Sequence, residues 1–393
     1  MPKQSEVLSL TGLRFVSAFY VFLFHIHIRW PLTKIPLLKG IIDVGAVGMS
    51  VFFVLSGFLL FLGYHDIKGR VGDYLVNRVA RIYPIYFLAG FLTLPWLNIP
   101  LGGGLVEMLV GLAKMAFIFI ANAFVIQAWF PPLFNHWNNS GSWSISVEVF
   151  CYLLLPLMIP YLVKLSRKSL VWVLLFCYLF VVMVGLVGRL YPGYGVPVFY
   201  AMPIFRLPEF IIGGCVCLLI KDRERTRAWW GVQGAVIVLV ALYLGRYAEL
   251  LPIYVGHNWI VVPAVAFIIA SLYQGGGPLH WLLSRRWCVW LGKISYCFYS
   301  FQALLIFVLI DHHAALIGAY PVFADSRILA LASFVVLICF SALGYYLVEE
   351  PARKWIRQRK VGSTELEGSN LIDRGSHWST NQKASTPSRV FSS

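Results

Sequence analysis

The chain has 393 residues, of which 59% are hydrophobic and 12% charged, and its mean hydropathy is +0.76. Soluble domains usually carry about 25% charged residues, so this composition excludes an ordinary soluble fold and indicates a polytopic membrane protein. The formal net charge of +15 could suit nucleic acid, but the basic residues concentrate in short loops between apolar runs, as the positive-inside rule describes. We therefore expect no nucleic-acid partner, and expect membrane lipid headgroups or a polyphosphate ligand instead.

Ten apolar runs are long enough to cross a bilayer. They cover approximately residues 8–30, 43–64, 82–99, 143–163, 169–188, 199–220, 228–246, 259–273, 287–310 and 327–348. The pattern predicts an all-α fold, a polytopic membrane helix bundle of about ten transmembrane helices. It forms one domain, 1–356, followed by a disordered tail, 357–393, that is rich in Ser, Thr, Asn and Gly. The first run has almost no basic n-region and no small-residue cleavage site, so we expect it to be retained as a span.

The orientation follows from the distribution of basic residues. A further run, 105–130, is interrupted by Lys114, Asn122 and Gln127. If it does not cross and the N-terminus is cytoplasmic, nineteen Lys and Arg residues lie inside and six lie outside. A full crossing would put Arg78 and Arg81 opposite the later basic loops. We therefore expect both termini in the cytoplasm, and expect 105–130 to be re-entrant or to lie along the outer face.

Two ionisable residues inside the first run are candidates for function, because such groups are costly to insert in a membrane. Arg14 and His25 are eleven residues apart, about 1100° of helix, and therefore share one face about 16 Å apart along the axis. His27 points elsewhere, and we expect it at the interface beside Trp30. The alternative for an intramembrane histidine is a hydrogen-bonded packing residue.

The entry to the third span carries Arg78 and Arg81 at i and i+3, close enough to grip one phosphate group. They face the same side of the membrane as the Arg14 end of the first helix. The simpler interpretation is that both are charges that set the topology.

The second and fourth spans add further candidates. Small residues at 45, 48, 50, 56 and 57 suit close helix packing, although Ser56 could also face a polar cavity. In the fourth span, which begins near Ser144, Glu148 is expected at the depth of His25, where a carboxylate could fix the tautomer of the imidazole. The alternative is a structural ion pair with Arg206 or Lys293.

The sixth and ninth spans hold the remaining polar candidates. Arg206 and Glu209, at i and i+3, can neutralise each other as a structural pair. The ninth span contains Lys293, and its Tyr296, Tyr299 and Gln302 fall on one face at intervals of three. That face is either the wall of a polar cavity or a set of internal hydrogen bonds. No His, Cys, Asp or Glu cluster has the spacing of metal ligands, so we expect no metal.

Taken together, these motifs resemble the acyltransferase 3 family of integral membrane acyltransferases over roughly residues 8–356. The matching motifs, in order, are Arg14 followed by ten residues and His25, Phe52-Phe53-Val54-Leu55-Ser56-Gly57-Phe58, Arg78-x-x-Arg81-Ile82-Tyr83-Pro84, Ser142-Trp143-Ser144-x-x-x-Glu148, Leu291-Gly292-x-x-Ser295-Tyr296 and Glu349-Glu350-Pro351.

The resemblance implies O-acyl transfer, usually of acetyl, from an acyl-CoA to a hydroxyl of a carbohydrate or other extracytoplasmic acceptor, in a multi-pass protein of the bacterial plasma (inner) membrane. It implies functional roles for Arg14 and His25 and for Arg78 and Arg81. Many members have an acid where this chain has Ser50 and a histidine where it has Gln302. Many also carry a fused SGNH esterase-like domain, which this sequence does not contain, so proteins of polysaccharide biosynthesis or export are expected partners.

The resulting hypothesis is that acetyl-CoA, as acyl donor, binds through its phosphates to Arg78, Arg81 and Arg14, and that its pantetheine arm extends towards His25. His25, oriented by Glu148, would then deprotonate the acceptor hydroxyl. An acyl-enzyme on His25, Ser56 or Ser144 would allow a two-step relay instead. Two other classes remain open: a proton-coupled transporter or exporter of a glycan or lipid-linked sugar that uses His25, Glu148, Arg206 and Glu209, and a nonenzymatic assembly partner.

Overall fold

The computed structural model describes residues 7–65, 71–97, 99, 102–138, 141–222, 230–251, 254–356 and 358, and these residues contain helices and no strand. The helices are α1 (Leu8–His27), α2 (Pro36–Asp43), α3 (Gly48–Tyr64), α4 (Val71–Leu92), α5 (Leu105–Ala123), α6 (Trp143–Leu162), α7 (Arg167–Leu190), α8 (Pro203–Ile220), α9 (Trp230–Tyr247), α10 (Asn258–Gln274), α11 (Gly277–Leu283), α12 (Arg286–Ala319) and α13 (Ser326–Gly344). The all-α prediction is confirmed. The predicted tail, 357–393, lies outside the described residues apart from residue 358.

Short segments of other helix types join these elements. The 3₁₀ segments used below are η1 (Gly45–Val47), η8 (Ala248–Leu250) and η9 (Tyr254–His257), and two π-helical segments, η6 (Val196–Tyr200) and η11 (Tyr345–Glu349), precede α8 and extend α13. Side-chain caps set some boundaries: Ser166 accepts a hydrogen bond from the backbone of Ser169 at the start of α7.

Ten helical segments of the described residues are long and apolar enough to cross a membrane, as the sequence predicts. One of the ten segments is not the one that the sequence predicts. The predicted span 82–99 corresponds to α4, which begins earlier and carries Asp73, Arg78 and Arg81, whereas α5 meets the criterion of length and composition in its place. Charges in its N-terminal half make α4 less apolar than the other spans.

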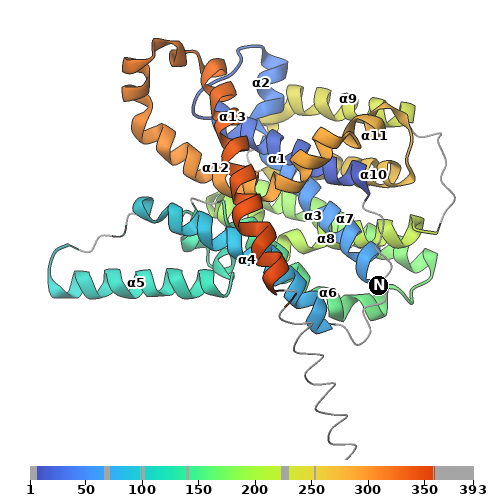
Figure 1. Ribbon diagram of the computed structural model, residues 1–393. Helices are drawn as coiled ribbons and strands as arrows, with labels where there is room; N and C mark the ends of the chain where they lie inside the picture. The colour runs from blue at the N-terminus through green and yellow to red at the C-terminus, as the bar shows by residue number, and fades with distance from the viewer. Residues whose placement is uncertain are drawn as a thin grey trace, which may run out of the picture.

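Helix α5 projects from the side of the bundle in Figure 1, and only 22% of its most apolar stretch is buried inside the protein. Its C-terminal end meets α4 well inside the bundle: the Tyr86 hydroxyl donates to Oδ1 of Asn122 at 2.6 Å, and the Tyr83 hydroxyl donates to the carbonyl of Ala123 at 3.3 Å. Tyr83 is about 18 Å along the axis of α4 from its first residue. The end of α5 therefore lies beside the middle of α4, and the expectation that 105–130 is re-entrant or lies along the outer face stays a prediction.

Close backbone contact holds α3 against α8 near the centre of the bundle (Figure 1). A Cβ atom on Gly57 would collide with the carbonyl of Phe210, and one on Gly213 would collide with the carbonyl of Val54. Small residues allow such an approach in lipid, where close packing drives helix association. The expectation that the glycines of the second span serve packing is therefore confirmed for Gly57.

Helix α1 lies at the centre of the fold, packed between α3 and α12. Its buried aromatic side chains pack against α12, since Phe298 contacts Phe15 at 5.5 Å and Phe22 at 5.7 Å between ring centroids. A neighbouring face of α1 lines two cavities, and this face carries the candidate residues.

Candidate functional site

Arg14 and His25 both face the interior of the bundle, on the side of α1 that the eleven-residue spacing predicts. They line two adjoining cavities. The inner cavity, with a volume of about 40 Å³, includes Arg14, Arg81 and Glu148 among its lining residues. The outer cavity, of about 330 Å³, includes His25 and Gln302. Met49 and Tyr299 line both, so these two side chains form the wall between them.

The side chain of His25 is held by Gln302 of α12. Nδ1 of His25 is 3.2 Å from Oε1 of Gln302, and Nε2 of Gln302 donates to the backbone carbonyl of Ala18 at 3.2 Å. The bond to Ala18 fixes the amide so that its oxygen faces the imidazole, and an amide oxygen can only accept. The proton of neutral His25 therefore lies on Nδ1, which leaves the lone pair of Nε2 available.

The prediction that Glu148 orients His25 is wrong in this structure. Oε2 of Glu148 accepts a hydrogen bond from the Tyr152 hydroxyl at 2.9 Å, and its carboxylate lies in the inner cavity with Arg14. The depth estimate assumed that α6 starts at the outer surface. Instead, the first turn of α6 is buried, and Ser144 donates to the Tyr299 hydroxyl at 3.0 Å, so Glu148 lies one cavity deeper than His25. Glu148 is not paired with Arg206 or Lys293 either, since Arg206 binds Glu209 and Lys293 is exposed.

Arg78 and Arg81 differ in their surroundings although both lie on α4. Arg81 lines the inner cavity with Arg14, whereas Arg78 is not among the lining residues. The guanidinium of Arg78 lies 5.6–5.8 Å from the centroids of three aromatic rings, those of Tyr64, Tyr74 and Tyr152. The structure therefore brings Arg81 together with Arg14, and encloses Arg78 among tyrosines.

Two guanidinium groups, those of Arg14 and Arg81, supply the positive charge of the inner cavity. Among the salt bridges of the described residues, none includes Arg14 or Arg81. Glu148 lies in the same cavity and the buried Glu349 interacts electrostatically with both arginines, so two carboxylates offset the charge of the two guanidinium groups. Such groups bind phosphates and polarised carbonyl oxygens.

The remaining candidates divide into cavity walls and a separate network. Ser56, Ser144, Tyr296 and Tyr299 line the inner cavity, and Tyr299 and Gln302 line the outer one. The face of the ninth predicted span is both a cavity wall and a set of internal bonds, because the Tyr296 hydroxyl also donates to the carbonyl of Ile82 at 2.9 Å.

Arg206 and Glu209 form the predicted structural ion pair, at 3.0 Å, and neither lines the two cavities described above. Both are almost completely buried. Arg206 also donates to the Ser50 hydroxyl at 3.1 Å, and Asn258 donates to Glu209 at 2.8 Å. Ser50, where many acyltransferase 3 members have an acid, thus contacts this pair. The sequence does not indicate that Asn258 contacts this pair, because Asn258 lies 49 residues from Glu209 on another helix.

His27 differs from its expected interfacial position, since it is 3% exposed. Its Nε2 lies 3.5 Å from Oδ1 of Asp43, and its Nδ1 accepts a hydrogen bond from the backbone of Leu32 at 2.8 Å. His27 therefore ties the loop after α1 to α2, which is the packing role that the sequence left open for a histidine of this helix.

Aromatic residues dominate the wall of the outer cavity opposite His25. They include Trp143, Tyr200 and Tyr254, which contact one another in series, with ring centroids 4.6 Å and 5.3 Å apart. Sequence reasoning did not single these residues out, since aromatic residues are common in every span.

The comparisons with known proteins agree with this arrangement. The family model described as "Acyltransferase domain" matches residues 7–349. "Acyltransferase MdmB" of Streptomyces mycarofaciens is 28% identical over 389 residues, which cover 92% of this chain and 96% of that protein. "Putative peptidoglycan O-acetyltransferase YrhL" of Bacillus subtilis (strain 168) is 25% identical over 377 residues, or 88% of this chain and 54% of that protein.

"Putative O-acetyltransferase SACOL0978" of Staphylococcus aureus (strain COL) is 22% identical over 382 residues, and the match covers 58% of its length. The chain thus spans nearly all of the Streptomyces relative and little more than half of the other two. No solved structure gives a significant match. Because the family model covers almost all of the ordered bundle and includes Arg14, His25, Arg81 and Glu148, the chain belongs to the acyltransferase 3 family of membrane acyltransferases.

Proposed function

We propose that this protein transfers an acetyl group from cytoplasmic acetyl-CoA to a hydroxyl of a carbohydrate on the far side of the bacterial plasma membrane. The observation that carries the proposal is the pair of adjoining cavities along α1, one lined by two guanidinium groups and the other by an oriented imidazole. The relatives named O-acetyltransferases support acetyl as the acyl group. Proteins that assemble or export the polysaccharide would supply the acceptor.

Arg14 and Arg81 are the groups that we assign to the acyl-CoA. The basic loops lie on their side of the membrane in the predicted topology, so a polyphosphate would approach from the cytoplasm. The inner cavity of about 40 Å³ cannot hold a nucleotide. The phosphates are therefore placed at its mouth, and side chains must move to admit the pantetheine arm.

His25 is the general base in this proposal. Because Gln302 holds its protonated Nδ1, Nε2 can take the proton of an acceptor hydroxyl in the outer cavity. The aromatic wall of Trp143, Tyr200 and Tyr254 suits the apolar faces of sugar rings, since aromatic side chains provide flat, amphipathic contact surfaces.

The chemical step balances without a metal or an oxidant. As Nε2 of His25 accepts the hydroxyl proton, the acceptor oxygen bonds to the thioester carbonyl carbon, and the carbon–sulfur bond then breaks. The sulfur leaves as a thiolate and takes the proton back from the imidazolium, which gives free CoA and an ester. Gln302 accepts from Nδ1 throughout, so the ring keeps its orientation.

The test is to incubate purified protein in lipid with acetyl-CoA labelled in the acetyl group and with surface polysaccharide, and to measure label on the glycan. We expect transfer by wild type and a loss of about 10²-fold or more in His25→Ala, the range typical of a lost general base. His312→Ala is the control, because His312 is exposed on α12 and lines neither cavity. Transfer that survives in His25→Ala would remove His25 from the chemistry.

The same experiment without acceptor separates direct transfer from a relay. Direct transfer leaves no label on the protein. Label that remains covalently bound to Ser56 or Ser144 would show an acyl-enzyme instead. Import or export of sugar without any transfer of label would support the transporter alternative.

A further inference from the structure

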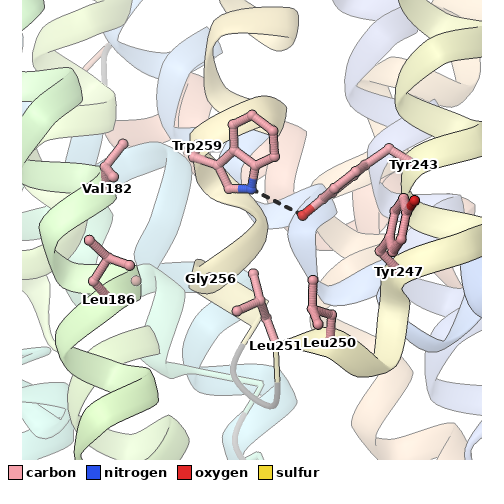
Figure 2. A pocket seen from close by; sticks show the side chains of 9 residues that line it. Val182, Leu186, Tyr243, Tyr247, Leu250, Leu251, Gly256 and Trp259 are labelled. Carbon is pink, nitrogen blue, oxygen red and sulfur yellow. Dashed lines mark hydrogen bonds between the residues drawn. The ribbon is translucent and has the colours of Figure 1, made fainter.

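A third cavity, of about 370 Å³, opens between α7, α9 and α10, away from Arg14 and His25 (Figure 2). It shares no lining residue with the inner or the outer cavity. Its volume is within the range of about 300–1,000 Å³ that is usual for ligand sites. Leu186 of α7 faces Leu250 and Leu251 across the opening, and Trp259 and Tyr243 lie at one end. We refer to this cavity as the α7–α9 groove.

The polar side-chain atoms of Trp259 and Tyr243 in the wall of the α7–α9 groove form hydrogen bonds within the protein. Nε1 of Trp259 donates to the Tyr243 hydroxyl at 3.0 Å, as Figure 2 shows, and that hydroxyl donates to Nδ1 of His257 at 3.3 Å. Nε2 of His257 in turn donates to the carbonyl of Ala248 at 3.3 Å. These hydrogen bonds satisfy Tyr243, His257 and Trp259 within the wall. Apart from the hydroxyl of Tyr247, the groove therefore presents an apolar surface to its occupant.

Two arginines lie at the edge of the groove, each one helical turn beyond a lining residue. Arg189 follows Leu186 by three positions on α7, and its guanidinium donates to the carbonyl of Leu250 at 2.8 Å. Arg246 follows Tyr243 by three on α9 and lies 5.9 Å from the ring centroid of Tyr247. Both are exposed, and neither takes part in the ion pairs found among the described residues.

These two arginines belong to the small set of basic residues on the outer side in the predicted topology, where lysine and arginine are usually depleted. Their guanidinium groups make the edge of the groove positively charged, which complements an anionic headgroup. From the apolar groove and its cationic edge we infer that the groove binds one acyl chain of an anionic phospholipid of the outer leaflet, whose phosphate contacts Arg189 and Arg246.

The bound lipid would stabilise one wall of the outer cavity, where the proposed acceptor binds. The 3₁₀ segment η9 contributes Gly256 to the groove and Tyr254 to the outer cavity, where Tyr254 contacts Phe24 beside His25 at 5.4 Å. One short segment thus has the lipid on one side and the acceptor on the other. Occupancy of the groove should stabilise η9 and, with it, the position of Tyr254.

The test uses the full chain, purified in mild detergent and stripped of lipid. Phosphatidylglycerol or phosphatidylcholine with the same acyl chains is then added, and native mass spectrometry counts the lipid molecules retained. Leu186→Trp fills the groove. Leu179→Trp is its matched control: it lies two turns earlier on the same face of α7, is 56% exposed against 58% for Leu186, and does not line the groove.

We expect wild type and Leu179→Trp to retain one equivalent of phosphatidylglycerol that Leu186→Trp loses. The double variant Arg189→Gln/Arg246→Gln replaces two exposed residues and should weaken retention of phosphatidylglycerol roughly ten-fold, because charge-assisted bonds to its phosphate are lost. Retention of phosphatidylcholine should change much less, because its trimethylammonium group already offsets the attraction between its phosphate and the arginines. Retention in Leu186→Trp equal to that in Leu179→Trp would overturn the site. Equal retention of the two lipids by wild type would contradict the preference for an anionic headgroup. A bound molecule whose mass matches neither lipid, and which Leu186→Trp loses, would show that the groove does not bind a phospholipid.

Discussion

His25 of α1 and Gln302 of α12 are 277 positions apart in the sequence, and their side chains meet at 3.2 Å between Nδ1 and Oε1. Gln302 is itself anchored by the carbonyl of Ala18, two turns before His25 on the same helix. The three groups form a closed unit across the α1–α12 contact. A neutral amide thus takes the place that a carboxylate holds in many catalytic sites, where it orients the base.

The first prediction concerns this unit. Gln302→Leu removes the hydrogen-bond acceptor of Nδ1, so the imidazole of His25 loses its fixed tautomer. We expect kcat to fall roughly ten- to a hundred-fold, because a misoriented general base supplies only part of its usual rate enhancement. The KM for acetyl-CoA should stay unchanged, because Gln302 does not line the inner cavity. Gln302→Glu keeps an acceptor oxygen and should retain more activity than Gln302→Leu. Equal losses in both variants would contradict a role through Nδ1.

Features with a local signal could be predicted from the sequence. Hydropathy gives the spans, since each needs about twenty apolar residues regardless of its neighbours. The helical repeat places Arg14 and His25 on one face, and both do face cavities. The i, i+3 spacing gives the Arg206–Glu209 pair, because both partners belong to one helix.

Features that depend on which helices are neighbours could not be predicted. Nothing in α1 indicates that Gln302 will lie beside His25. The sequence places Glu148 too near the surface because nothing in it shows that the first turn of α6 is buried in the bundle, where Ser144 contacts Tyr299. Arg78 and Arg81 are about 60° apart around α4. This angle is large enough for Arg81 to line the inner cavity while Arg78 lies among tyrosines.

The second prediction uses Arg78 and Arg81 as a matched pair. Arg81→Gln removes a guanidinium from the inner cavity, so the KM for acetyl-CoA should rise about ten-fold or more, with a smaller change in kcat. Arg78→Gln leaves the cavity charge intact but removes cation–π contacts worth about 0.5–1 kcal/mol each at exposed sites. It should therefore lower the midpoint of thermal unfolding more than it raises KM. A larger increase in KM for Arg78→Gln than for Arg81→Gln would support the hypothesis that both arginines bind the same phosphate group.

The third prediction concerns the buried pair of Arg206 and Glu209. Glu209→Gln leaves the guanidinium of Arg206 buried without its counter-charge, and we expect a loss of roughly 3–5 kcal/mol in the free energy of unfolding. The double variant Arg206→Met/Glu209→Gln should recover much of that loss. Thermal unfolding in detergent measures the stability, and label transfer by the folded fraction measures activity. Near-normal activity of the double variant is expected, whereas its complete loss in a stable protein would point to a relay that uses this pair.

The fourth prediction concerns Tyr299, which with Met49 separates the two cavities. On the proposed route through the inner cavity, the thioester of an acyl-CoA reaches His25 only after Tyr299 moves. Its hydroxyl accepts a hydrogen bond from Ser144 at 3.0 Å, which holds the ring in place. Because the ring also keeps water of the outer cavity away from the inner one, we expect Tyr299→Ala to hydrolyse acetyl-CoA several-fold faster than wild type when no acceptor is present.

Tyr299→Phe keeps the ring and loses only the bond to Ser144, so its hydrolysis should stay near the wild-type rate while transfer changes by a few-fold at most. Free CoA released in the absence of acceptor gives the hydrolysis rate, and labelled glycan gives the transfer rate. His25→Ala/Tyr299→Ala shows whether the leak uses the same base: hydrolysis should fall back towards the His25→Ala level. If Tyr299→Ala releases no more CoA than Tyr299→Phe, the ring does not separate the thioester from the water of the acceptor side.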